Sequence, residues 1–130
     1  MAGRAFLDTQ VALWLASGDK RLSSQAVKAI NSSSQTIVSA ISIAELEAKA
    51  MTGKLPVPQG LAQIFRDQGI SVESFDDRAA EQLRRFASLA KHDPFDRMLL
   101  AQASSRVATS FYTADSVIAE LGFDWVVDCR

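Results

Sequence analysis

The stretch RAFLDTQVALWLASG, residues 4–18, joins a short apolar run to a helical pattern and places one acid at their junction. Its first part predicts a strand over residues 4–8, and its second part predicts a helix over Thr9–Ser17 that Gly18 closes. A strand that leads directly into a helix is the opening unit of an α/β domain. Asp8 ends this strand, so we expect its carboxylate to lie at a sheet edge and to be partly enclosed.

The rest of the chain alternates in the same way between short β-rich runs and helical patterns. Further strands are predicted at residues 36–39, 70–75, 109–113 and 125–127. Helices are predicted at residues 24–31, 42–53, 60–67, 77–90, from 94 onward and at 116–121. This order predicts an α/β fold with a mostly parallel sheet of four to five strands and helices on both faces. The polar alternation of residues 70–75 favours a strand with an exposed face or an edge strand.

Length and composition indicate one globular domain over residues 1–130. Hydrophobic residues make up 48% and charged residues 22%, which excludes a disordered chain. The apolar runs fall far short of the ~20 residues that a membrane helix needs. Asp8 and Gln10 interrupt the region where a signal peptide has its apolar segment, and Cys129 is the only cysteine. We therefore expect a cytoplasmic protein that does not associate with membranes.

Charge sets a limit on how the protein can bind nucleic acid. Fourteen Lys and Arg residues against fifteen Asp and Glu residues give a net charge of −1. This balance argues against a nucleic-acid binder that works mainly by bulk positive charge. It leaves a nuclease open, because an active site for hard cations is itself rich in carboxylates.

Four acids are predicted to lie at one edge of the sheet, where the carboxyl ends of parallel strands meet and ligands bind. Asp8 ends the first strand, and Asp115 follows the strand at residues 109–113. Ser42 and Glu45 have capping-box spacing, which places Glu45 in the first turn of its helix. Asp96 lies in the first turn of a helix that Asp93 caps, with proline at the first helical position. Residues at the start of such helices point back towards this edge, so the four carboxylates are able to converge.

Converging carboxylates need a cation. Two of them ~4 Å apart repel by about 4 kcal/mol at an effective dielectric of 20. The ligand set would be all oxygen, because the chain has one histidine and its one cysteine is Cys129, almost at its end. This favours Mg²⁺ or Mn²⁺ over Zn²⁺. A metal-dependent phosphodiesterase is the natural chemistry for such a site.

Each acid also has a plainer structural role that the sequence leaves open. Glu45 completes a capping box, Asp96 favours the helix dipole, and Asp115 suits a turn or an N-cap. Asp93 is more typical of an N-cap than of a metal ligand. His92 is expected in a surface loop, and the tryptophans and phenylalanines are expected in the core.

Other chemistries have weaker support. No glycine-rich phosphate loop, serine nucleophile elbow or catalytic triad is found. A phosphatase that uses Asp8 would want a second aspartate two residues on, where the chain has Gln10. A receiver-type domain phosphorylated on Asp8 is a further interpretation, although such domains place extra acids near the first strand.

Four segments of the chain resemble the PIN-domain ribonucleases and, within them, the VapC-type toxins of bacterial toxin–antitoxin pairs. They are FLDTQVALWLASGD (6–19), VSAISIAELEAKAMTGKL (38–55), DPFDRMLLAQA (93–103) and YTAD (112–115). The resemblance covers essentially the whole chain, and residues 93–103 are its most specific part. The chain departs from the common pattern at Gln10, at Ala44 and at Lys91-His92-Asp93. None of these departures is at a proposed metal ligand.

The resemblance implies a three-layer α/β/α PIN-like fold and an endoribonuclease that depends on Mg²⁺ or Mn²⁺ and inhibits translation. It nominates the same four acids as metal-binding and catalytic residues: Asp8, Glu45, Asp96 and Asp115. It also implies an RNA substrate, a cognate antitoxin and a homodimer or a heteromeric complex with the antitoxin. Thr113 is suggested as a hydrogen-bond partner of a carboxylate or water, and Arg97 as a contact to RNA phosphate. The alternative function is a PIN-like module that binds RNA or protein without cutting.

Overall fold

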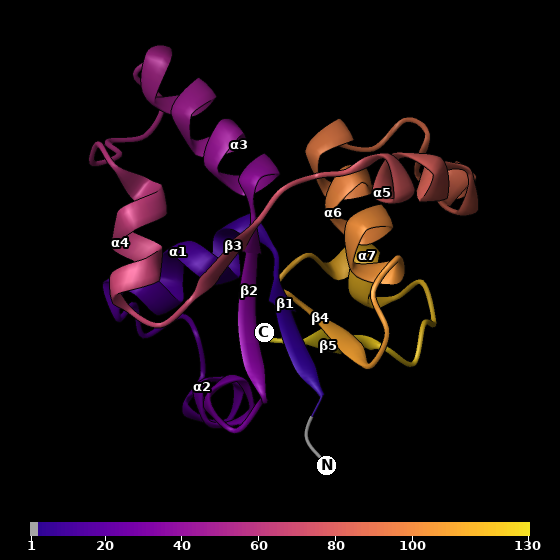
Figure 1. Ribbon diagram of the computed structural model, residues 1–130, viewed down its shortest axis with the longest axis horizontal. Helices are drawn as coiled ribbons and strands as arrows, with labels where there is room; N and C mark the ends of the chain where they lie inside the picture. The colour runs from indigo at the N-terminus through magenta and orange to yellow at the C-terminus, as the bar shows by residue number, and fades with distance from the viewer. Residues whose placement is uncertain (1–2) are drawn as a thin grey trace.

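The computed structural model describes residues 3–130, over which five parallel strands form one sheet in the order β3-β2-β1-β4-β5 (Figure 1). The strands are β1 Arg4–Leu7, β2 Gln35–Ser39, β3 Ser71–Glu73, β4 Thr109–Thr113 and β5 Val126–Asp128. The sequence predicted this parallel sheet and favoured an exposed face or an edge position for β3, and both predictions are confirmed. The chain passes from β1 through β2 to β3 on one side and returns to β4 and β5 on the other. The order therefore reverses beside β1, where ligands bind in open α/β sheets.

Two hydrophobic clusters, one on each face of the sheet, give the molecule three layers. Alternating residues of β1 point to opposite faces. Ala5 and Leu7 join the cluster formed with α1 Thr9–Ser17, α2 Ser24–Asn31, α3 Ala40–Met51 and α4 Leu61–Asp67. Phe6 joins the cluster formed with the helical segments that lie beyond residue 81. These are the 3₁₀ segment η1 Gln82–Leu89, α6 Pro94–Ser104 and α7 Ser116–Ala119, and α5 Asp77–Glu81 packs against α6. The two groups of helices flank the strands in Figure 1.

The helix predicted over residues 77–90 is not continuous, and that prediction is wrong. An α-helical turn passes into the 3₁₀ segment η1, and Phe86 has the non-helical dihedrals φ −113° and ψ 36°. The ring of Phe86 packs edge-on against Phe123 and Trp125, with centroids 5.7 and 6.3 Å away. This buried aromatic contact is a tertiary constraint, which the helical pattern of the segment does not reveal.

The helix α3 begins earlier than the capping-box spacing predicted. Ser39, the last residue of β2, is its N-cap and accepts a hydrogen bond from the Ile41 N–H. Glu45 therefore lies in the second turn of α3 and not in the first. Ser42 does not cap the helix, because it is buried against Thr9. The capping box is a wrong prediction, and its loss leaves the Glu45 carboxylate free for other contacts.

Gln102 connects the end of β2 to α6 in the fully buried interior. Its Oε1 accepts a hydrogen bond from the Ser39 hydroxyl, and its Nε2 donates to the Ser74 carbonyl at 3.0 Å. Gln102→Met keeps a side chain of similar length but leaves the buried Ser39 hydroxyl without its acceptor and removes the donor to the Ser74 carbonyl. We expect it to lower the free energy of unfolding by about 1–3 kcal/mol, as measured by urea denaturation. A loss below about 0.5 kcal/mol would contradict this role for the amide.

None of the helices within residues 3–130 has the length and hydropathy needed to cross a membrane.

Candidate metal centre

Asp8 lies at the carboxyl end of the central strand β1 and is almost fully buried, with 5% of its surface exposed. It caps α1, because its Oδ1 accepts a hydrogen bond from the Val11 N–H at 2.7 Å. Its Oδ2 accepts from the Thr113 hydroxyl and from the Ala114 N–H. These donors fix the carboxylate between β1 and β4. Burial still raises its pKa, and the three hydrogen bonds oppose this rise.

Asp96 stands in the first turn of α6, which Asp93 caps by accepting a hydrogen bond from the Phe95 N–H. Among residues 3–130 its one polar partner is His92, whose Nε2 lies 3.3 Å from Asp96 Oδ2. Burial and the nearby charges of Asp93, Glu45, Asp115 and Asp8 raise the pKa of Asp96 to about 7. This carboxylate is therefore the least compensated of the group.

Asp115 follows β4 and uses its two oxygens in different directions. Oδ1 caps α7 by accepting hydrogen bonds from the N–H groups of Val117 and Ile118. Oδ2 lies 3.3 Å from His92 Nε2. The N-cap role that the sequence left open for Asp115 is present, and it holds the second oxygen beside Asp96.

Glu45 reaches the same place from α3 and carries its own partners. Its Oε1 accepts from the Thr9 hydroxyl at 2.7 Å, and its Oε2 pairs with Lys49 Nζ at 3.0 Å. Lys49 is one helical turn further along α3, so both side chains share one face of the helix. This ion pair gives Glu45 the compensation that Asp96 lacks.

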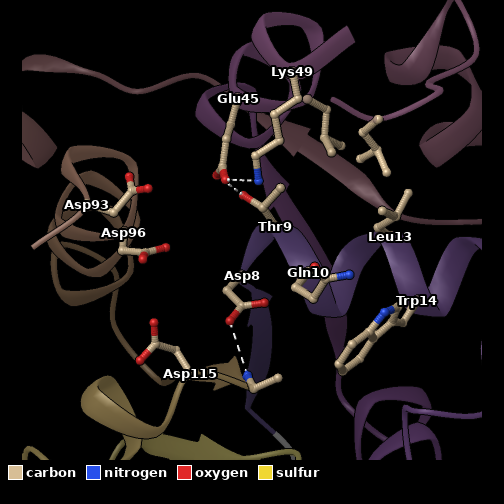
Figure 2. A pocket seen from close by; sticks show the side chains of 13 residues that line it. Asp8, Thr9, Gln10, Leu13, Trp14, Glu45, Lys49, Asp93, Asp96 and Asp115 are labelled. Atoms are coloured by element: carbon tan, nitrogen blue, oxygen red, sulfur yellow. Dashed lines mark hydrogen bonds and ion pairs between the residues drawn. The ribbon is translucent and has the colours of Figure 1, made fainter. Parts of the chain in front are cut away.

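These side chains line a cleft of about 340 Å³ at the carboxyl ends of the strands (Figure 2). Figure 2 shows the carboxylates of Asp8, Asp96 and Asp115 facing one another, with Glu45, Thr9 and Lys49 beside them. The apolar side chains of Leu13, Trp14 and Leu55 also line the cleft, and Figure 2 shows Leu13 and Trp14 on the side away from Asp93 and Asp96. The structure thus brings together the four acids named from the sequence.

The donor set fits a divalent cation. The four acids named from the sequence and Asp93 line one cleft, and Lys49 is the only basic side chain among its lining residues within 3–130. Carboxylates spaced ~4 Å apart repel by about 4 kcal/mol at an effective dielectric of 20. Burial raises the pKa of Asp96 to about 7, and the neighbouring carboxylates add to this rise. Oxygen ligands of this kind suit Mg²⁺ or Mn²⁺.

Sequence reasoning missed or misplaced three residues of this region. His92 lies in the loop before α6, as expected, but the contacts of its ring with Asp96 and Asp115 were missed. Lys49 was not singled out, although its spacing from Glu45 was a usable signal. Trp14 was expected in the core, but it is half-buried, borders the cleft and stacks with the Arg21 guanidinium 5.1 Å from its ring centroid. The suggested hydrogen bond from Thr113 to a carboxylate is present.

Thr9 supports Glu45 from inside the protein, because its hydroxyl also lies 2.9 Å from Ser42 Oγ. Thr9→Val preserves the shape of the side chain and leaves two buried polar groups without this partner. We expect a loss of about 1–3 kcal/mol in the free energy of unfolding, measured by urea denaturation of the metal-free protein. The matched control is Thr36→Val in β2, whose hydroxyl has no hydrogen-bond partner in residues 3–130. Equal effects of the two substitutions would contradict a supporting role for Thr9.

Comparison with known proteins identifies the class of this fold. The family model of the PIN domain matches residues 5–124, and the chain therefore belongs to the PIN-domain family. A comparison with curated proteins found no match.

Several solved structures share the fold. A chain of the DNA-bound VapBC complex from Salmonella typhimurium is 20% identical, with a TM-score of 0.70 over 100% of both chains. A chain of a toxin–antitoxin complex from Klebsiella pneumoniae is 20% identical, with a TM-score of 0.67 over 97% of this chain and 98% of the other. The third is from VapBC2 of Rickettsia felis bound to a promoter DNA fragment. It is 9% identical, with a TM-score of 0.67 over 98% of this chain and 99% of the other.

Proposed function

We propose that this protein is a metal-dependent endoribonuclease and the toxin of a toxin–antitoxin pair. The observation that carries the proposal is the cleft in which Asp8, Glu45, Asp96 and Asp115 meet at the switch point of a PIN-domain sheet. The structural similarity to chains of VapBC and toxin–antitoxin complexes supports the assignment to a toxin. RNA cleavage in the cytoplasm is then the means by which the protein inhibits translation.

The four acids would hold Mg²⁺ or Mn²⁺. When bound, such a cation makes water more acidic and neutralises the charge that develops on a phosphodiester during hydrolysis. We assign direct contact with the cation first to Asp8, which the Val11, Thr113 and Ala114 donors hold in place. Asp96 is the second direct contact, because its charge is the least compensated. Glu45 and Asp115 would complete the site directly or through water.

Other residues that line the cleft are assigned to contacts with RNA and with the antitoxin. Lys49 lines the cleft, and its side chain is 44% exposed, so its ammonium is available to an RNA phosphate. The pairing with Glu45 holds this ammonium beside the acids. Leu13, Trp14 and Leu55 offer an apolar surface next to the charged one. A cleft with one acidic and one apolar side suits an amphipathic segment, and we assign it to the cognate antitoxin. We also expect a homodimer or a heteromeric complex with that antitoxin.

The proposal is tested by incubating the antitoxin-free protein with a mixed RNA pool in Mg²⁺, in Mn²⁺ and in EDTA. Fragments should form with either metal and should be absent with EDTA. A duplicate preparation carrying Asp96→Asn exposes any contaminating nuclease, which would cut equally in both. A folded sample that binds the metal and RNA but leaves every RNA intact would favour the non-catalytic binding module. Phosphorylation of Asp8 by a small phosphodonor would instead support a receiver domain.

A further inference from the structure

We propose that His92 is a positioning residue of the metal site, which holds the Asp96 and Asp115 carboxylates together by donating its Nε2–H between them. The inference rests on the proposed function, because it concerns how the same cation site is built. Its basis is the position of Nε2, 3.3 Å from Asp96 Oδ2 and 3.3 Å from Asp115 Oδ2.

The direction of the hydrogen bond follows from the chemistry of the three groups. Ionised carboxylates only accept hydrogen bonds, whereas a neutral imidazole has one N–H and one lone pair. If Nε2 carried the lone pair, the lone pair would face two electron-rich carboxylate oxygens, and the contacts would be repulsive. The tautomer with hydrogen on Nε2 gives both oxygens a donor, and it is the arrangement that the distances favour.

The His92 ring contacts the carboxylates without forming part of the cleft lining. Asp96 and Asp115 line the cleft, and His92 is not one of its lining residues. The His92 backbone donates a hydrogen bond from its N–H to the carbonyl of the buried Leu89 at 2.9 Å. The ring is therefore next to the two carboxylates, while other side chains line the cleft.

The two carboxylates need such a link because they come from different elements. Asp96 projects from α6, and Asp115 projects from the turn between β4 and α7. The ligand atoms of His92, Asp96 and Asp115 lie within 4.8 Å of one another. Two negative charges this close repel, so the side chains separate unless a donor or a cation lies between them. A donor that is not part of the cleft lining keeps their spacing and leaves the cleft open to a cation.

Two substitutions separate hydrogen-bond donation from direct binding of the cation. His92→Gln keeps an N–H donor at a position close to that of Nε2, and an amide nitrogen has no lone pair available for a metal. His92→Leu removes the donor and keeps an apolar side chain. Lys91→Leu, at the exposed neighbouring position, is the matched control. Urea denaturation of each metal-free variant checks that it is folded.

The measurement is Mn²⁺ binding, followed by the loss of the free-ion signal in electron paramagnetic resonance. We expect His92→Leu to weaken Mn²⁺ binding by about 10–100-fold, the usual effect of losing a group that orients metal ligands. His92→Gln and Lys91→Leu should remain within about threefold of the wild type. Pulsed spectra of the Mn²⁺-loaded wild type should show no strong coupling to an imidazole nitrogen.

Several results would overturn the proposal. One is wild-type affinity in His92→Leu, and another is binding by His92→Gln as weak as that of His92→Leu. A strong nitrogen coupling in the wild type would make His92 a ligand instead. If His92→Leu does not fold, the affinity of His92→Gln and the wild-type spectrum still decide the question. Wild-type protein that binds no Mn²⁺ would contradict both proposals, whereas Mn²⁺ binding without RNA cleavage would contradict only the nuclease function.

Discussion

Asp8→Asn and Asp96→Asn are each expected to lower the rate of RNA cleavage about a hundredfold or more at saturating Mg²⁺. Asparagine has nearly the shape of aspartate, but an NH₂ group replaces one oxygen and the negative charge is lost. In Asp8→Asn one carboxylate oxygen becomes an NH₂ group, so the hydrogen bonds from Thr113 and Ala114, or the one from Val11, are lost. In Asp96→Asn the site loses the carboxylate charge that has the least compensation from its neighbours. The rate is measured as the initial rate of cleavage of a labelled RNA.

The matched control is Asp67→Asn, which changes an exposed acid at the end of α4. It alters the net charge of the protein by the same amount, and its cleavage rate should stay within about twofold of the wild type because surface changes of this kind have small effects. Either site variant cutting RNA at the control rate would show that the proposed site is wrong.

Asp96→Asn is expected to lower the rate of RNA cleavage but to raise the stability of the metal-free protein. In the metal-free protein the buried Asp96 charge lies near other acids, which raises its pKa to about 7. Removing this charge should raise the free energy of unfolding at pH 8 by about 1–2 kcal/mol, a figure that allows for partial exposure of the group to solvent. A gain in stability with a loss of activity is typical of residues kept for function.

The pH dependence follows from the direction of the same shift. The folded Asp96 has a pKa of about 7, whereas the ordinary pKa of aspartate is 3.8, so between these values the folded state holds more protons than the unfolded state. The contribution of Asp96 to stability therefore falls as the pH rises through this window and is constant above it. The advantage of Asp96→Asn over the wild type should be small near pH 4 and largest at about pH 8.

This prediction is checked by urea denaturation of both proteins in EDTA across the pH range. Asp67→Asn should show no such trend relative to the wild type. Saturating Mg²⁺ should stabilise the wild type and should have little effect on Asp96→Asn, because a ligand stabilises only the state that binds it. A lower stability of Asp96→Asn at pH 8 would mean that Asp96 is well compensated in the folded protein.

Asp8 is expected to behave differently from Asp96 in the same experiment. Its oxygens accept three hydrogen bonds, and an asparagine amide cannot replace all of them. Asp8→Asn should therefore give a smaller gain in stability at pH 8 than Asp96→Asn, because the lost hydrogen bonds offset the removal of a buried charge whose pKa is raised by burial. The comparison distinguishes Asp8, whose carboxylate accepts three hydrogen bonds from the fold, from Asp96, whose charge has little compensation.

The sequence predicted best those features that follow from local residue patterns and from the topology of the sheet. Apolar runs alternating with helical patterns predicted the parallel sheet, and its carboxyl edge then placed Asp8 and Asp115 together. Asp93 and Pro94 marked the start of α6 correctly, because a cap and a first-turn proline are local features. The resemblance to PIN domains, carried by residues 93–103 above all, agreed with these positions.

Features that depend on contacts distant in sequence were not predictable in the same way. The spacing of Ser42 and Glu45 fits a capping box, but Ser39 caps the helix because its hydroxyl also meets Gln102 across the core. Phe86 ends the helical turn because Phe123 and Trp125 surround its ring. In each case a tertiary contact outweighs a local preference.

The residues that support the acids were the least predictable part of the site. Lys49 follows Glu45 by one helical turn, but the sequence does not show that this face of α3 meets the cleft. His92 precedes the α6 cap, and only the fold brings its ring to Asp115. Single lysines and histidines are common on surfaces, so their roles become visible when the distances are known.

The most direct test of the central claim is calorimetric titration of Mn²⁺ into the metal-free wild type and into Asp96→Asn at about pH 7. The account predicts saturable binding to the wild type, with protons released because ligands must be deprotonated to hold a metal. The same titration of Asp96→Asn should give binding that is at least about tenfold weaker. Equal binding by the two proteins, or no binding by the wild type, would contradict the assignment of these carboxylates to a metal centre.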